Sequence, residues 1–217
     1  MADRILVVEG EEDRKLFLAL FRVHGIPDVD VHFQPSGKGN AISTFCSVLM
    51  MQPRSRRSKV GLVVDADFEG AGAGNRASVK DINAKALKVG YGPLSAITGG
   101  GYEARSRSGH LTRVGVWVMP DCSNDGYTEH LLVQAVGPAE QVRFNHAKVA
   151  CDNALLGCGN FDYPVRPDHR IKARLGTWLA WQDPPRMSFA SAIDKSLFDA
   201  EHGCMRPLVA WMHWLYS

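Results

Sequence analysis

The sequence lacks the features that mark an exported, membrane-bound or strongly basic protein. Its five cysteines are an odd number without Cys-x-x-Cys spacing, so they predict neither a disulfide framework nor a zinc site. No apolar run approaches the ~20 residues of a membrane helix, and no signal region precedes the first expected strand. The formal net charge is only +2 at pH 7, so a polyanion would have to bind a local basic patch. These absences favour a soluble, cytoplasmic protein with no membrane partner.

Short apolar runs alternate with helical patterns in the first part of the 217-residue chain. The runs predict strands at 4–8, 29–33, 60–64 and 114–118. Apolar residues at helical spacing predict helices at 12–23, 41–51 and 78–89. Polar, glycine-rich segments are expected to form loops at 68–75 and 99–113. Strands that alternate with helices imply an α/β fold with a mainly parallel sheet flanked by helices.

The C-terminal part of the chain shows mainly helical patterns. Helices are expected at 129–136, 141–156, 170–181, 189–198 and 207–216. The aromatic residues at helical spacing are expected to pack these helices together rather than to stack on bases: Trp178, Trp181, Trp211, Trp214 and Tyr216. We therefore expect an α/β domain over 1–137 and a helical C-terminal region over 138–217 packed on it, with a single domain overall as the alternative.

Acidic residues directly follow two of the apolar runs. Glu9 follows the first run and is succeeded by Gly10 and Asp13, and Asp65 and Asp67 follow the third run as Asp-x-Asp. The carboxyl ends of parallel strands meet at one edge of a sheet. Because Mg²⁺ takes a few carboxylates together with water and phosphate oxygens, we expect Glu9, Asp65 and Asp67 to bind Mg²⁺ or Mn²⁺, with Asp13 just behind them. The alternative is that these acids are solvated loop charges.

The ordered pattern Glu9-Gly10-x-x-Asp13, a strand, and Asp65-x-Asp67 resembles the motif set of toprim domains. Such domains occur in topoisomerases, primases, OLD-type nucleases and ribosomal-RNA-maturation nucleases. The segments 114–121, 172–173 and 177–182 are similar to a bacterial and archaeal toprim-related family catalogued only as a domain of unknown function, over nearly the whole chain. The resemblance implies a toprim (Rossmann-like) fold, Mg²⁺ held by Asp65 and Asp67, and Glu9 as general acid or base.

Further acids follow the fourth predicted strand. Asp121 comes at its end, and Asp125 and Glu129 lie in the next loop and at the start of the next helix. Together they are candidates for the second site of a two-metal nuclease. The alternative for Asp125 and Glu129 is that they stabilise a helix N-terminus. Asp121 is the strongest metal-ligand candidate of the three.

Glycine-flanked turns and one lysine are candidates for contacts with phosphate. Gly10 lies in a tight strand-to-helix turn, and Gly37-Lys38-Gly39 precedes a helix, so both segments are candidate phosphate-binding turns. Ordinary structural turns have the same composition. Lys172 is a candidate catalytic residue that neutralises phosphate charge, a role favoured by the family resemblance, and its alternative is a solvated helix face.

The first functional hypothesis is a Mg²⁺-dependent phosphoryl-transfer enzyme, a nuclease or phosphodiesterase acting on DNA or RNA. No tyrosine stands in a recognisable nucleophile context, and the chain has neither a primase zinc module nor a Gly-x-x-x-x-Gly-Lys-[Ser/Thr] loop. A stand-alone nuclease is therefore favoured, with basic runs at 54–59 and 105–113 as candidate backbone contacts. A homodimer, or an ATPase on a separate chain, stays open. The second hypothesis is a non-catalytic subunit that binds a nucleotide or nucleic acid within a larger complex.

Overall fold

The computed structural model describes residues 3–33, 35, 37–53, 57–68, 74–157 and 169–217, with side chains up to residue 154 and from residue 169 onward. Six strands form one mixed sheet in the order β2-β1-β3-β6-β5-β4. The four strands on one side of this order are parallel to one another: β2 (Asp30–Phe33), β1 (Arg4–Val8), β3 (Lys59–Asp65) and β6 (Arg113–Met119). The α/β fold with a mainly parallel sheet is therefore confirmed.

Two short strands complete the sheet. β5 (Tyr102–Ala104) pairs antiparallel with β6, and β4 (Ser95–Ala96) pairs antiparallel with β5. The prediction of a loop over 99–113 was wrong for β5. Strands of two or three residues are too short to show the alternation of apolar and polar side chains by which a sequence reveals a strand. Their position depends on pairing with β6.

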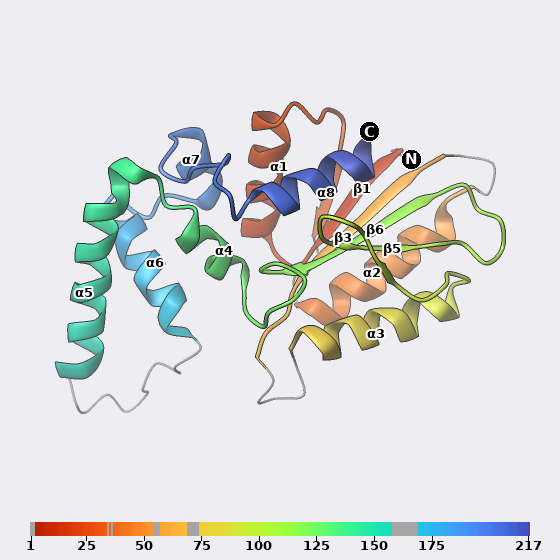
Figure 1. Ribbon diagram of the computed structural model, residues 1–217, viewed down its shortest axis with the longest axis horizontal. Helices are drawn as coiled ribbons and strands as arrows, with labels where there is room; N and C mark the ends of the chain where they lie inside the picture. Colours follow the sequence, from red (N-terminus) through yellow and green to blue (C-terminus); the bar gives the residue numbers. More distant parts are fainter. Residues whose placement is uncertain (1–2, 34, 36, 54–56, 69–73, 158–168) are drawn as a thin grey trace.

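Helices cover both faces of the sheet (Figure 1). α2 (Lys38–Met51) and α3 (Asn75–Lys88) lie on one face, and α1 (Glu11–Val23) and α8 (Arg206–Tyr216) lie on the other. α8 can approach the sheet closely because glycines face it at paired positions of β3 and β6. A Cβ atom at Gly61 would lie 2.8 Å from the Tyr216 hydroxyl, and one at Gly115 would lie 3.1 Å from Leu215. A larger side chain at either position would push α8 away from the sheet.

Among the described residues, the remaining α-helices are α4 (Thr128–Gln134), α5 (Gln141–Gly157), α6 (Arg170–Ala180) and α7 (Phe189–Asp194). They lie on the side of the molecule toward which the carboxyl ends of the parallel strands point (Figure 1). α5 and α6 are joined by a bidentate ion pair in which Arg174 donates to Asp152 at 2.7 and 2.9 Å. The helical C-terminal region is confirmed, and the division into two domains stays a prediction. Among the described residues, no helix is long and apolar enough to cross a membrane.

The aromatic residues of the C-terminal helices have different surroundings. Trp178 is fully buried and packs edge-on against Phe144 and Phe198, as expected for packing between helices. Trp211, by contrast, packs on Trp117 of the sheet, and Trp181 is 48% exposed. Because helical spacing identifies a shared face but not the surface that covers it, the expectation of one helical aromatic core was too broad.

The helix expected over 189–198 ends at Asp194. Ser196 has a φ of 55°, in the left-handed region, and the Leu197 N–H bonds back to the Ala192 carbonyl at 2.9 Å. This closure satisfies a free carbonyl at the helix end and turns the chain away.

Candidate active site

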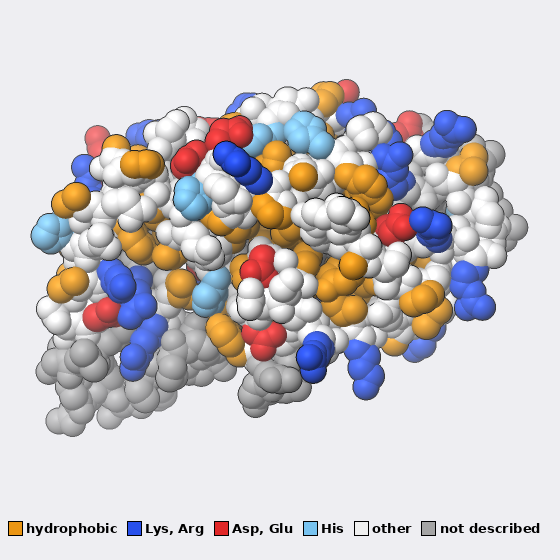
Figure 2. Space-filling model, viewed as in Figure 1, with side chains coloured by type: hydrophobic (Ala, Val, Ile, Leu, Met, Phe, Trp, Pro, Cys, Tyr) orange, Lys and Arg blue, Asp and Glu red, His pale blue; other side chains and the backbone are white. Residues whose placement is uncertain are grey.

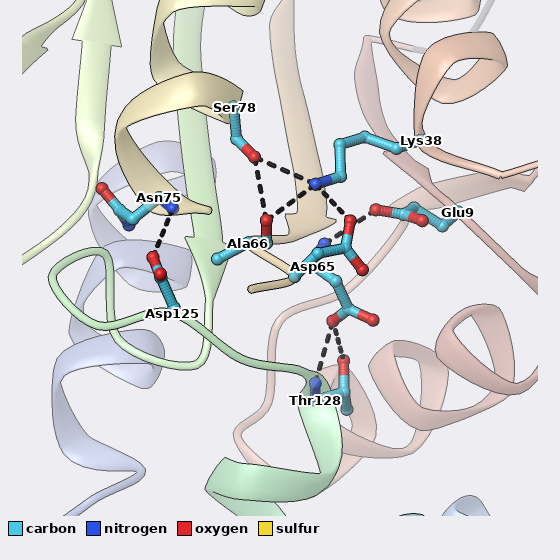
Figure 3. Close-up of polar contacts among 9 residues, drawn as sticks. Glu9, Lys38, Asp65, Ala66, Asn75, Ser78, Asp125 and Thr128 are labelled. Carbon is cyan, nitrogen blue, oxygen red and sulfur yellow. Dashed lines mark hydrogen bonds and ion pairs between the residues drawn. The ribbon is translucent and has the colours of Figure 1, made fainter. Parts of the chain in front are cut away.

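Two acids, Glu9 and Asp65, meet where β1 and β3 end (Figure 3). The Asp65 N–H donates to Glu9 Oε1 at 2.8 Å, across the boundary between these neighbouring parallel strands. Asp65 Oδ1 accepts from the Thr128 N–H at 2.8 Å, at the start of α4. The Thr128 hydroxyl lies 3.1 Å from Asp65 Oδ1 and 3.4 Å from Asp13 Oδ1. The structure therefore brings Glu9, Asp13 and Asp65 together, as their order in the sequence predicts.

The surroundings of these acids favour their neutral forms. Burial raises the pKa of Glu9 to about 7, although the Asp65 N–H and the charge of Lys38 act in the opposite direction. Burial, followed by the charge of Glu129, raises the pKa of Asp13 to about 6. For Asp65, burial and then the charges of Asp13 and Glu9 raise the pKa well above its ordinary value. Buried like charges repel one another, so these acids need either protons or a cation near neutral pH.

Asp67 is also at this edge, and it pairs with Lys38. Lys38 Nζ lies 2.6 Å from Asp67 Oδ2 and donates to the Ala66 carbonyl at 2.9 Å and to Ser78 Oγ at 3.0 Å (Figure 3). The backbone of Asp67 is fixed by two hydrogen bonds with Gly126, both 2.9 Å long. The candidate phosphate-binding lysine thus lies at the acidic edge, held by an acid and by two neutral acceptors.

The glycines of the two candidate phosphate-binding turns lie at the starts of two different helices, α1 and α2. Gly37 precedes α2 with a φ of 80°, a conformation that favours glycine, and Gly39 lies in the first turn of α2. Gly10 precedes α1 in an extended conformation, and a Cβ atom at this position would lie 3.5 Å from Asp13 Oδ2. Phosphate binding by Gly10, Gly37 and Gly39 stays a prediction.

Lys172 reaches the same edge from α6. Its Nζ lies 3.4 Å from Glu129 Oε1 and 4.1 Å from the centre of the Tyr127 ring, and its charge lowers the pKa of Asp13 against the larger effect of burial. The second carboxylate oxygen of Glu129 is buried without a hydrogen-bond partner. Glu129 therefore belongs with Asp13 and Asp65, in addition to lying in the first turn of α4.

Asp121 and Asp125 have other partners. Asp121 accepts from the Ser123 and Asn124 N–H groups at 3.0 and 2.8 Å and from the Asn124 side chain at 2.7 Å. These hydrogen bonds lower the pKa of Asp121 against the opposing effect of burial. Asp125 accepts from the Asn75 N–H at 2.7 Å, at the first residue of α3. Asp125 therefore stabilises a helix N-terminus, and metal binding by Asp121 stays a prediction.

Two polar residues that hold the site were not predicted from the sequence. Thr128 joins Asp65 to Asp13, and Ser78 holds Lys38. Thr128 stands immediately before the helix expected from Glu129, where a threonine is a typical cap, and this position was its one recognisable signal. Ser78 gave no signal because it comes close to Lys38 only through the packing of α3 against α2.

The donor groups are compatible with a hard divalent cation, although they are not arranged as a finished site. Within the described ranges, no three His, Cys, Asp or Glu side chains are placed so that they could hold a metal ion. The acids instead accept hydrogen bonds from backbone N–H groups, Thr128 and Lys38. Their carboxylate oxygens, including the unpartnered oxygen of Glu129, are nevertheless the ligand type that Mg²⁺ and Mn²⁺ prefer. Metal binding would require side-chain rotations within this cluster.

The family described as "Protein of unknown function (DUF3226)" matches residues 3–217. The chain belongs to the DUF3226 family. The resemblance to a family of unknown function over nearly the whole chain is thereby confirmed, whereas the relation to toprim domains stays a prediction. No curated protein and no solved structure matched the chain.

Of the described residues in the predicted basic runs, Lys59 and Arg113 lie at the end of β3 and β6 opposite to the acids. Arg54 and Arg56 lie outside the described residues. Arg113 begins β6, at the opposite end from the acids, and donates to the Trp214 carbonyl at 2.6 Å. Arg105 pairs with Glu103 at 2.8 Å. Figure 2 shows a different group of Lys and Arg side chains over α5 and α6.

Proposed function

We propose that this DUF3226 protein is a Mg²⁺- or Mn²⁺-dependent phosphoryl-transfer enzyme, a nuclease or phosphodiesterase that acts on nucleic acid and is related to toprim enzymes. One observation supports the proposal most strongly. Glu9, Asp13 and Asp65 share one edge of the sheet, and burial and mutual repulsion raise the pKa of each. Such a cluster is unfavourable when ionised, and perturbed acids of this kind are typical of functional sites.

The metal would be held by oxygens of Glu9, Asp65 and Asp67, with Asp13 and Glu129 next to them. When bound, a divalent cation supplies charge neutralisation for the phosphate that reacts. It would also remove the repulsion between the acids, because their ionised forms would then face a cation. The cluster is therefore expected to lose protons when it takes up the metal.

Glu9 is the residue best suited to transfer a proton. In the metal-free protein its pKa is about 7, and a bound cation would lower this value, so an oxygen of Glu9 that the metal leaves free would accept a proton from the attacking group. The hydrogen bond from the Asp65 N–H, 2.8 Å long, fixes the orientation of its carboxyl group. Lys172, 3.4 Å from Glu129, places a positive charge beside the acids, where it would attract a phosphate oxygen.

A nucleic-acid substrate is supported by charge on the C-terminal helices. Arg174, Lys148 and Arg170 all act on Asp152 and lower its pKa, so these cations lie close together on α5 and α6. The same helices lie on the side toward which the carboxyl ends of the strands point (Figure 1). Cations arranged in this way are typical of surfaces that contact a sugar-phosphate backbone.

The test is a cleavage assay with single- and double-stranded DNA, RNA and small phosphodiesters, in Mg²⁺, Mn²⁺ or EDTA. Wild type is compared with Glu9→Gln, the double variant Asp65→Asn/Asp67→Asn, and Glu12→Gln, an exposed acid that pairs with Lys15. We expect metal-dependent cleavage that is lost in the first two variants and kept in the third. Equal cleavage by wild type and Glu9→Gln, or no cleavage of any substrate, would contradict the proposed phosphoryl-transfer activity.

The second candidate is a non-catalytic subunit that binds a nucleotide or nucleic acid. It is favoured by the internal neutralisation of the acids, since Lys38 pairs with Asp67 and Lys172 with Glu129. This candidate predicts binding of ligand without turnover. It also predicts that Glu9→Gln keeps the ligand affinity of the parent.

A further inference from the structure

The ammonium group of Lys38 contacts Asp67, one of the proposed metal ligands. It is 2.6 Å from Asp67 Oδ2, 2.9 Å from the Ala66 carbonyl and 3.0 Å from Ser78 Oγ (Figure 3). An ammonium group has three N–H donors, so these three acceptors use all of them. Lys38 is therefore directed into the acidic edge in this state.

Lys38 and Lys172 differ in how tightly they are held. The Lys38 side chain is 19% exposed and contacts its acid at 2.6 Å, whereas the Lys172 side chain is 39% exposed and lies 3.4 Å from its acid. Lys38 also acts on Glu9, whose pKa its charge lowers against the larger effect of burial. Of the two lysines, Lys38 is the one whose charge acts directly on the proposed metal ligands Asp67 and Glu9.

We propose that Lys38 is an internal counter-cation that competes with the divalent ion for Asp67 and, once displaced, pairs with a phosphate group of the nucleotide or nucleic-acid substrate. The inference rests on the metal dependence proposed above. Two cations that share one carboxylate repel each other, so metal binding weakens the ion pair between Lys38 and Asp67. One N–H of Lys38 then loses its acceptor, and a phosphate oxygen can replace it.

A consequence is that metal and phosphate bind cooperatively. A phosphate group that accepts from Lys38 stabilises the displaced lysine, and this state leaves Asp67 available to the metal. The coupling is reciprocal, because each ligand changes the affinity for the other by the same factor. Without the Lys38 charge, metal binding should become tighter and less dependent on phosphate.

The experiment measures Mn²⁺ affinity by calorimetry near neutral pH, with and without thymidine 5′-monophosphate as the phosphate probe. Wild type is compared with Lys38→Met, with Lys38→Arg, which keeps the charge, and with Lys80→Met, which removes an exposed charge from α3. Lys38→Gln, which keeps a donor for Ala66 and Ser78, replaces Lys38→Met should that variant fail to fold. Thermal melting checks the folding of each protein.

We expect Lys38→Met to lower the Kd for Mn²⁺ about tenfold, as the loss of one neighbouring positive charge near a protein surface allows. The probe should tighten Mn²⁺ binding in wild type, Lys38→Arg and Lys80→Met, and should do so less in Lys38→Met. An unchanged or higher Kd in Lys38→Met overturns the inference and leaves the metal site intact. Failure of every variant and of wild type to bind Mn²⁺ overturns the proposed function as well.

Discussion

Replacing Glu9 with glutamine should stabilise the metal-free protein, and increasingly so as the pH rises. The pKa of Glu9 is raised from 4.5 to about 7 in the folded protein. Between these two values the unfolded chain releases the Glu9 proton while the folded protein keeps it. The unfolded state therefore binds fewer protons, and the contribution of Glu9 to stability falls as the pH rises through this window. Glutamine cannot ionise, so the variant does not share this loss.

The size of the stabilisation by Glu9→Gln follows from the shift in the pKa of Glu9. A difference of about 2.5 pKa units at about 1.4 kcal/mol each gives a destabilisation of about 3 kcal/mol once the pH exceeds 7. The glutamine side chain of the variant can still accept from the Asp65 N–H through its carbonyl oxygen, so the hydrogen bond of 2.8 Å need not be lost. The advantage of Glu9→Gln should thus be small near pH 4.5 and reach about 3 kcal/mol at pH 8.

The assay is urea unfolding in EDTA, followed by the fluorescence of the five tryptophans at a series of pH values. Glu12→Gln is the matched control, because Glu12 is exposed and pairs with its neighbour Lys15, so its effect should stay within about 0.5 kcal/mol at every pH. A difference between wild type and Glu9→Gln that does not change with pH would refute the assignment of a raised pKa. A difference that shrinks as the pH rises would refute its sign.

Three further substitutions separate the roles of individual side chains. Asp121→Ala should cost about 1 kcal/mol of stability in urea, because the turn loses its acceptor. Calorimetry with Mn²⁺ tests its predicted role as a ligand: these hydrogen bonds favour an unchanged Kd, and a large rise in Kd would show that Asp121 binds the metal. Lys172→Met should slow cleavage about 10²–10³-fold in steady-state assays, with partial recovery in Lys172→Arg, as for removal of one charge-stabilising donor; full activity would place Lys172 outside the catalytic machinery. Trp178→Ala should lower the free energy of unfolding by about 3–5 kcal/mol, since the buried indole would leave a cavity; a loss below about 1 kcal/mol would contradict its place in the core.

The parallel strands and the convergence of Glu9 with Asp65 were predictable because both follow from local patterns. A strand that is buried on both faces reads as a continuous apolar run, and β1 and β3 are such strands. Neighbouring parallel strands end at the same edge, so acids that follow them directly must lie near each other. No knowledge of the loops was needed for this inference.

The partners of those acids depend on loop paths and on helix packing, which local patterns do not reveal. Thr128 reaches Asp65 from 63 positions away in the sequence, and Ser78 meets Lys38 from 40 positions away. The turn that contains Asp121 shows the same limit, because its carboxylate is engaged by N–H groups within three residues. An acid at a strand end can therefore serve its own loop, and the sequence pattern alone does not separate that use from metal binding.

The central claim is that the acids at the ends of β1 and β3 bind a divalent cation. Anomalous X-ray diffraction from crystals of the protein grown with Mn²⁺ tests this claim most directly. The account predicts an anomalous peak within about 2.0–2.3 Å of carboxylate oxygens of Asp65 and of Glu9 or Asp67, with Lys38 moved away from Asp67. Crystals that show no anomalous peak at these acids, with the ion pair between Lys38 and Asp67 unchanged, would contradict the claim.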